Sequence, residues 1–204
     1  RQRQWNWIAL SSNAKLKLSL SELLSLEITN WEWTVLSGRK DILFDNESIL
    51  STLDKSYISW DWAELSTRTD LQYNEDFILK IWQKPMDWLS ISRQDSFVPS
   101  ANILSKLSIF DLDWDAISQN SALSKDVLYR NRLNWKYISQ SEAFQKLGIE
   151  FFRKYRAYLD WSIISNAAEF TLSRENLSEF KDIIDWKIIN QRNDLEYTNI
   201  LLDE

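Results

Sequence analysis

One short pattern, first seen as Trp5-Asn6-Trp7-Ile8-Ala9-Leu10-Ser11-Ser12-Asn13, occurs eight times along the chain. It consists of an acidic or amide residue, a Trp, two variable residues, a Leu or Ile, and a Ser that the eighth copy replaces with Asn. The Trp of the pattern is Trp7, Trp33, Trp62, Trp88, Trp114, Trp135, Trp161 and Trp186, a spacing of about 26 residues. Self-similarity at this period is typical of stacked repeats rather than of one globular core.

The composition favours helices. The chain has 204 residues, of which 44% are hydrophobic, enough to bury a core. It contains only two Gly and two Pro, whereas β-type repeats need Gly in their turns. No apolar stretch approaches the roughly 20 residues that span a bilayer, so we expect no membrane partner.

The chain contains neither Cys nor His. Without Cys there is no disulfide framework and no thiolate metal site. Without His the commonest general base and the commonest metal ligand are both missing. We therefore expect no catalytic residues, no metal site and no cofactor.

Positions within a repeat are counted from its Trp. Position −1 is Asp, Asn or Glu in every copy, and such side chains cap the free amides of a helix start. Position +3 is always Leu or Ile, one turn further along the same face. A first helix of about two turns is thus predicted to begin at each Trp. We expect the Ser at +4 to bond a carbonyl one turn back or a neighbouring repeat, satisfying a buried helix end.

A second helix of about ten residues is predicted in each repeat. Position +9 is apolar throughout, position +12 supplies a second cap, and position +16 is apolar again. In the first copy Ser19 and Glu22 form a capping box. The caps at +12 are Ser19, Asp45, Asn74, Ser100, Ser173 and Thr198.

Together these features predict an all-α fold, an α-solenoid of about eight short two-helix repeats with a period near 26 residues. The predicted caps are kept where the spacing between tryptophans varies. The shortest step, from Trp114 to Trp135, keeps the cap residue Ser124 and loses residues on both sides of it. Residues 1–204 are expected to form a single repeat array. Neither end resembles a polar capping repeat, so we expect the chain to be a piece of a longer protein.

The tryptophans of the pattern are expected to pack in the core, since they are strictly coupled to apolar positions +3, +9 and +16. Trp5, Trp31 and Trp60, at position −2, leave two alternatives open. They are either packing residues, as the Met, Leu and Ile of later copies suggest, or a partly exposed aromatic row.

The phrase W-x-W-x-x-[LI]-S-x-N, followed by a capped second helix, resembles tandem repeats in proteins of large DNA viruses and some bacteria. Residues 5–13 match the whole phrase, while Arg39 and Arg68 replace its Asn in the second and third copies. The resemblance spans the whole chain. It implies a repeat architecture and no particular activity.

The first functional hypothesis is a non-enzymatic scaffold whose curved surface binds another protein or another domain of the parent chain. Position +6 is the candidate partner strip because it is polar in the first five repeats. The strip consists of Asn13, Arg39, Arg68, Gln94 and Asn120.

The second hypothesis is nucleic-acid or phosphate binding. The chain carries a net charge of −6, but residues 125–156 hold eight basic and three acidic side chains. A solvated face paired with neighbouring acids is the alternative explanation for this basic segment. The candidate anion patch consists of Arg130, Arg132, Arg153, Lys154 and Arg156.

Overall fold

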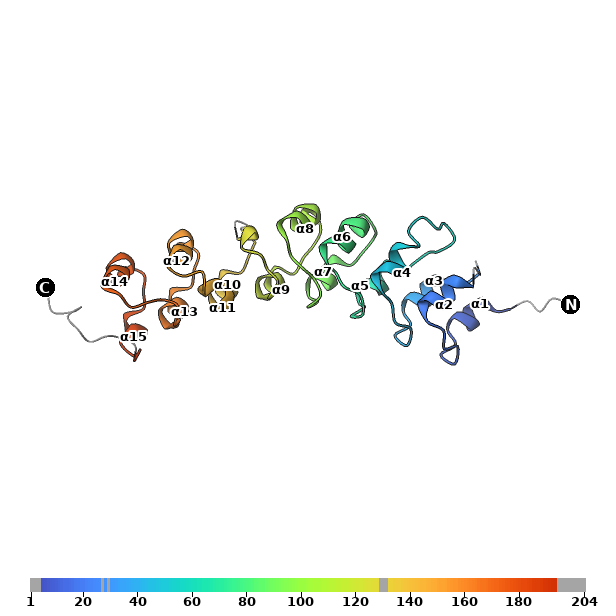
Figure 1. Cartoon of the computed structure of the whole chain (residues 1–204), viewed down its shortest axis with the longest axis horizontal. Coiled ribbons are helices and arrows are strands. Elements are labelled where there is room, and N and C mark those ends of the chain that lie inside the picture. The colour runs from blue at the N-terminus through green and yellow to red at the C-terminus, as the bar shows by residue number, and fades with distance from the viewer. Residues whose placement is uncertain (1–4, 27, 29, 129–131, 194–204) are drawn as a thin grey trace. The chain divides into compact units, whose positions relative to one another are not determined.

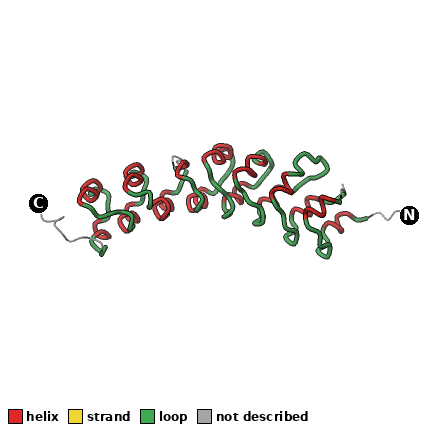
Figure 2. The backbone as a smooth tube through the Cα atoms, in the orientation of Figure 1, coloured by secondary structure: helices red, strands yellow, loops and turns green. Residues whose placement is uncertain are grey.

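The computed structural model describes residues 5–26, 28, 30–128 and 132–193 of the chain. They fall into two compact units, Arg1–Asp113 and Trp114–Glu204. Over the described ranges the secondary structure consists of fifteen α-helices and two 3-10 helices, with no strand (Figures 1 and 2). The prediction of an all-α fold with a helix at each recurring Trp is confirmed.

The first unit contains four helix pairs. The helices that begin at a pattern Trp, α1, α3, α5 and α7, pack each on the next, and the second helices α4, α6 and α8 do the same (Figure 1). The bounds are α1 (Trp7–Ser11), α2 (Leu20–Ser25), α3 (Trp33–Ser37), α4 (Asn46–Leu50), α5 (Trp62–Ser66), α6 (Glu75–Ile81), α7 (Trp88–Ser92), α8 (Ala101–Lys106) and the 3-10 helix η1 (Leu107–Ile109).

The second unit follows the same scheme with more variation. Helices α9, α10, α13 and α15 begin at pattern tryptophans and pack in that order, each on the next. The bounds are α9 (Trp114–Gln119), η2 (Lys125–Val127), α10 (Trp135–Gln140), α11 (Glu142–Gln145), α12 (Ile149–Tyr155), α13 (Trp161–Asn166), α14 (Arg174–Phe180) and α15 (Trp186–Ile189).

Side-chain caps start most of these helices, as predicted. At position −1 the caps that accept a backbone N–H are Asn6, Asp61, Asp87, Asn134, Asp160 and Asp185. The second helices are capped by Ser19, Asp45, Asn74, Ser100, Ser124 and Ser173, and Ser19 with Glu22 forms the expected capping box. Glu32 makes no cap bond, and Thr198 lies outside the described residues.

The predicted length of the second helix is wrong. The second helices α2, α4, α6, α8, α12 and α14 span five to seven residues rather than ten. After α4, for example, the amides of Thr52, Lys55 and Ile58 each bond the carbonyl three residues back. The chain therefore continues as a series of tight turns, and the backbone keeps its hydrogen bonds without extending the helix.

The core follows the apolar positions of the repeat. Position +3 is buried from the second repeat to the eighth: Leu36, Leu65, Ile91, Ile117, Ile138, Ile164 and Ile189. Trp31 and Trp60 are also buried, whereas Trp5 is 60% exposed. Trp31 packs edge-on against Trp7 at 5.4 Å between centroids, and Trp60 against Trp33 at 5.0 Å. These −2 tryptophans are therefore packing residues, except for Trp5.

Not every Trp of the pattern is buried, although burial of all of them was expected. Trp33, Trp88 and Trp161 are buried, Trp186 is 39% exposed, and the others are half-buried. Lys84 Nζ lies 5.6 Å from the ring centroid of Trp62, and the Arg132 guanidinium lies 5.7 Å from that of Trp114. Long cationic side chains therefore cover part of these rings in place of core residues.

A serine hydroxyl joins each repeat to the next. At all seven steps the Ser at +4 accepts a hydrogen bond from the backbone N–H of the next repeat's −1 residue, at 2.8–3.0 Å. Ser37 and Ser66 also donate to the carbonyl of their own Trp, at 2.7 Å. All seven serines are buried: Ser11, Ser37, Ser66, Ser92, Ser118, Ser139 and Ser165. The predicted role of the +4 Ser is confirmed.

Replacing Ser37 with Ala should destabilise the fold by about 1–3 kcal/mol, because the Asp61 amide loses its partner and the Trp33 carbonyl loses the hydroxyl bond that it accepts besides its helical one. Urea unfolding followed by circular dichroism measures this. Ser51→Ala is the matched control, since that hydroxyl is exposed and bonds only the Ser48 carbonyl. Equal effects of the two substitutions would contradict the joining role.

Candidate functional site

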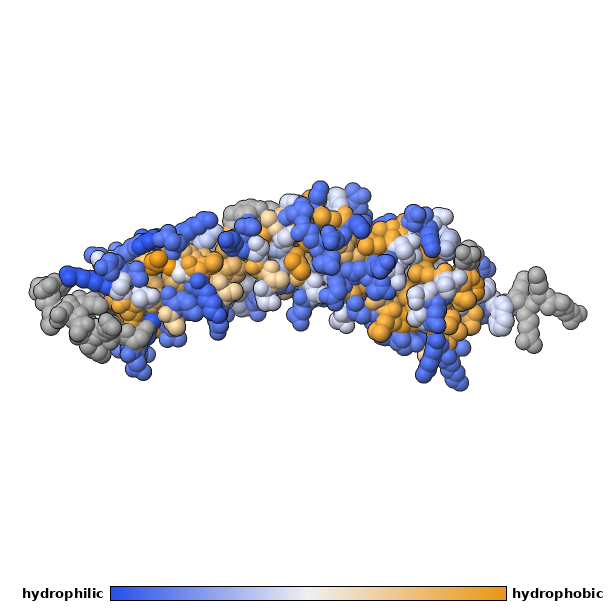
Figure 3. Space-filling view, in the orientation of Figure 1, coloured by the Kyte–Doolittle hydropathy of each residue, from blue (hydrophilic) through white to orange (hydrophobic). Residues whose placement is uncertain are grey.

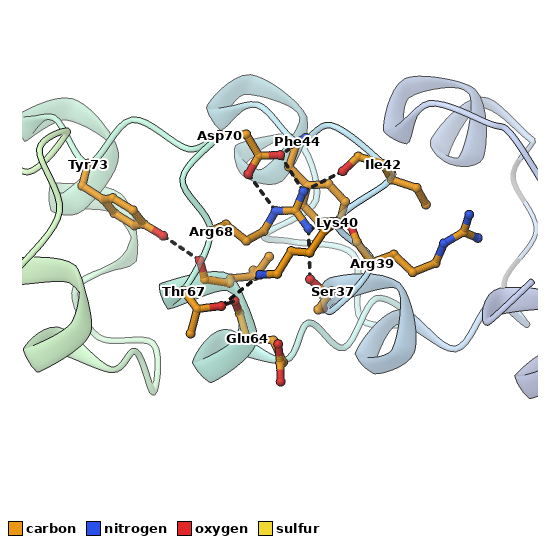
Figure 4. Close-up of polar contacts among 11 residues, drawn as sticks. Ser37, Arg39, Lys40, Ile42, Phe44, Glu64, Thr67, Arg68, Asp70 and Tyr73 are labelled. Carbon is orange, nitrogen blue, oxygen red and sulfur yellow. Dashed lines mark hydrogen bonds and ion pairs between the residues drawn. The ribbon is translucent and has the colours of Figure 1, made fainter. Parts of the chain in front are cut away.

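The +6 side chain of the third repeat, Arg68, reaches back into the second repeat (Figure 4). Its Nη1 donates to the carbonyls of Ser37 and Arg39 at 3.2 and 2.9 Å, and its Nη2 donates to that of Ile42 at 2.6 Å. The guanidinium carbon lies 3.8 Å from the centroid of the Phe44 ring. Only 2% of Arg68 is exposed. One guanidinium thus satisfies three carbonyls that α3 and the loop after it leave open.

Asp70 completes this contact. It pairs with Arg68, with Nε to Oδ1 at 2.9 Å, and its Oδ2 accepts the Phe44 amide at 2.8 Å. Burial acts to raise the pKa of Asp70, but the hydrogen bonds from Arg68 and from the Phe44 amide outweigh it, so the pKa is lowered. Beside them, Tyr73 donates to the Leu65 carbonyl at 2.6 Å, and burial raises the pKa of its hydroxyl.

Other +6 residues make the same contact. Arg39 donates to the carbonyls of Ser11 and Leu16 and pairs with Asp41. Gln94 donates to the Ser66 carbonyl at 2.7 Å, and Arg192, in the eighth repeat, to those of Ser165 and Ala167. Wherever this contact forms, one acceptor is the carbonyl of the preceding repeat's +4 Ser.

The prediction of an exposed partner strip at +6 is therefore wrong for Arg39 and Arg68. Both are buried, and their donors bond backbone carbonyls of the preceding repeat and the nearby Asp. Gln94 and Asn120 are half-buried, and only Asn13 is exposed. The spacing Arg-x-Asp, present at both buried arginines, is the sequence signal that could have revealed their role, because it places a carboxylate beside a buried guanidinium.

The basic residues of the candidate anion patch make different contacts in the structure. Arg153 pairs with Glu150 and Glu179, at 2.6 and 2.8 Å, and hydrogen bonds with Glu179 raise its pKa. Lys154 lies over the ring of Tyr155, Arg156 over Phe180, and Arg132 over Trp114. Arg130 lies outside the described residues. Two carboxylates already balance the charge of Arg153, which leaves Arg132, Lys154 and Arg156 as candidate cations for an anion.

A groove lies between η2 and α12 in the second unit, with a volume of about 530 Å³. Its apolar floor is formed by Leu128, Leu147, Phe151 and Tyr155. Its rim carries four charged side chains, Lys125, Asp126, Glu150 and Lys154. Apolar surface also interrupts the polar surface of this unit in the space-filling view (Figure 3). The groove can take apolar side chains and offers charges of both signs around them.

A second cavity of about 540 Å³ lies in the first unit. It is lined by Thr69, Gln72, Arg93, Gln94, Asp95 and Ser96. Over the described ranges, no three His, Cys, Asp or Glu side chains gather where they could hold a metal ion. Nor does that part of the chain contain a helix long and apolar enough to cross a membrane.

Comparison of the chain with protein-family models, with curated proteins and with solved structures finds no match. The resemblance to viral and bacterial tandem repeats therefore stays a prediction.

Replacing Arg68 with Met should destabilise the first unit by about 3 kcal/mol, because it leaves buried carbonyls and the Asp70 carboxylate without their donor. Arg93→Met is the control. Arg93 is exposed, its ion pair with Asp113 lies on the surface, and the expected loss is about 1 kcal/mol or less. Urea unfolding compares the two variants, and a loss for Arg68→Met no larger than that of the control would contradict the buried contact.

The Asp70 contact should also depend on pH. Its pKa in the folded chain lies below the ordinary value of about 3.9, so its stabilisation is present above that value and is lost as the pH falls through the lowered pKa. Asp70→Asn should therefore be less stable than the parent chain at pH 7, and the difference should shrink toward pH 2. Urea unfolding across this range measures the difference, and a difference independent of pH would contradict the ionised pair.

Proposed function

We propose that the chain is an α-solenoid of eight short two-helix repeats that serves as a non-enzymatic scaffold for another protein. Two rows of successively packed helices in the first unit, and the pattern-Trp row in the second, support the repeat stacking. The Trp spacing continues across the boundary between the units with a step of 26 residues, from Trp88 to Trp114. This continuity favours one repeat array.

The groove between η2 and α12 is the observation that carries the scaffold proposal. Leu147 is 45% exposed and Tyr155 is half-buried, whereas Leu128 and Phe151 are buried. The part of the apolar floor that Leu147 and Tyr155 form is therefore open to a partner. The candidate partner strip supports the same proposal by elimination. Three of its five residues, Arg39, Arg68 and Gln94, bond the preceding repeat, which leaves the groove as the better binding surface. Binding of a partner segment would cover this apolar area.

Nucleic-acid binding is the weaker proposal. Arg153, at the centre of the candidate anion patch, already pairs with two carboxylates, and the groove beside it carries Asp126 and Glu150. A nucleic acid carries a phosphate at every nucleotide, so it would bring negative charge against these carboxylates as well as against the cations, whereas a peptide can place its charges at single positions.

Selection of a random peptide display library on the folded chain tests the scaffold proposal. We expect enriched peptides that share apolar residues and bind saturably at about 150 mM salt, where screening weakens purely ionic contacts. Fluorescence anisotropy with single- and double-stranded oligonucleotides at about 50 and 200 mM salt runs in parallel. Oligonucleotide binding that falls steeply with salt, with no enriched peptide, would replace the scaffold by a nucleic-acid binder.

A further inference from the structure

The groove lies in the repeat with the shortest step in the chain, from Trp114 to Trp135. Among the described residues of this repeat, the segment after the Ser124 cap forms the three-residue 3-10 helix η2, and residues 129–131 lie outside the described part. In the first unit the equivalent helices α4, α6 and α8 pack directly on one another, and Asn102 of α8 donates to Glu75 of α6 at 2.7 Å. A neighbouring α-helix is thus the usual cover for this face of a repeat.

On α12 that face carries Phe151 and Tyr155, one turn apart, with the charged Glu150 and Lys154 at the rim. Leu147 precedes the helix, at the turn that Gly148 makes with a φ of 72°, and lines the groove with them. We call Leu147, Phe151 and Tyr155 the apolar stripe. The stripe lines the groove together with Leu128 from the η2 side. The opposite face of α12 is already occupied, because Phe152 is fully buried and Arg153 binds Glu179 of α14.

The charges at the rim are not equivalent. Glu150 is bound by Arg153 at 2.6 Å, and Asp126, which also lines the rim, accepts a hydrogen bond from the Ser124 hydroxyl at 3.4 Å. Lys125 and Lys154 are exposed and make no ion pair with a described carboxylate. The cations that remain for a ligand therefore stand on both sides of the apolar floor, one on η2 and one on α12.

We propose that this groove binds an acidic amphipathic helix of a partner protein. The partner's apolar side chains, one turn apart, pack on the exposed Leu147 and the half-buried Tyr155, and its carboxylates pair with Lys125 and Lys154. The partner helix packs on α12 as α4 packs on α6 in the first unit. This inference rests on the proposed scaffold function and names the partner segment for it.

Aromatic stacking does not favour a nucleic acid in this place. Tyr158 is 60% exposed, but its ring stacks on Trp135 at 5.0 Å between centroids, and Trp135 also contacts Tyr155 at 5.2 Å. Phe151, on the floor, is only 4% exposed. The rings therefore pack largely on one another, and the open floor suits aliphatic side chains better than bases.

The test is a display library of helical peptides of about 16 residues, which span four to five turns, with two apolar anchors one turn apart and all other positions random. The library is selected on the folded chain, and fluorescein-labelled winners are titrated by anisotropy. We expect acidic residues to be enriched next to the anchors. Lys125→Glu with Lys154→Glu should weaken binding about 30-fold and Leu147→Glu about tenfold.

Two controls separate a direct role from misfolding. Lys15→Glu and Leu43→Glu make the same changes at exposed positions of the first unit and should alter binding less than about twofold. A peptide in which Lys replaces the selected acids should bind the Lys125→Glu, Lys154→Glu variant better than the parent chain, because the charge pairs are then restored in reverse.

The outcomes distinguish the two proposals. Selected peptides whose affinity does not change with the groove substitutions, or that are basic, would overturn the groove assignment. The proposed scaffold function would then still hold. The groove assignment also falls if an oligonucleotide displaces the winners and loses its own binding in the Lys125→Glu, Lys154→Glu variant. Absence of winners from both this library and the random library would overturn both proposals.

Discussion

Short helices leave most of their backbone amides and carbonyls without intrahelical partners, and the whole structure depends on how these groups are satisfied. A helix of five residues, such as α3 or α5, has about four free N–H groups at one end and four free carbonyls at the other. Side chains must therefore supply the bonds that helix length does not. Caps serve the first amides, the Ser hydroxyl serves the amide of the next repeat, and Arg or Gln at +6 serves the carbonyls of the previous one.

The features that sequence predicted well are those whose donor and acceptor lie close along the chain. Asp61 and Ser19 cap helices that begin beside them, and the +3 residues repeat the helical period. The role of Arg68 was missed because its acceptors lie 26 to 31 residues earlier and are backbone atoms, which carry no sequence signature. The exposure of Trp186 was missed for a related reason: the same Trp pattern is surrounded by different neighbours in each repeat.

Function in such a chain is expected where the repeat departs from its own pattern. The recurrent polar side chains, such as the Ser at +4 and the Arg at +6, are buried in hydrogen bonds between repeats. A recurrent polar side chain is therefore a poor candidate for binding a partner. The shortened step at η2 departs from the pattern, and the groove beside it exposes Leu147 and part of Tyr155. The step of 21 residues from Trp114 to Trp135 is visible in the sequence. The groove itself could not be predicted from it, because the residues that line the groove depend on how α12 faces η2.

Amide hydrogen exchange, resolved by residue with NMR spectroscopy, measures directly whether hydrogen bonds to the Ser hydroxyls hold the repeats together. If the Ser hydroxyls join the repeats, the amides of Glu32, Asp61, Asp87, Asp160 and Asp185 should be protected to a similar degree as amides inside the helices, although they stand before the first helical turn. The amide of Lys40, on an exposed turn, gives the unprotected reference. Exchange of these five amides as fast as that of Lys40 would contradict the joining role of the Ser hydroxyls.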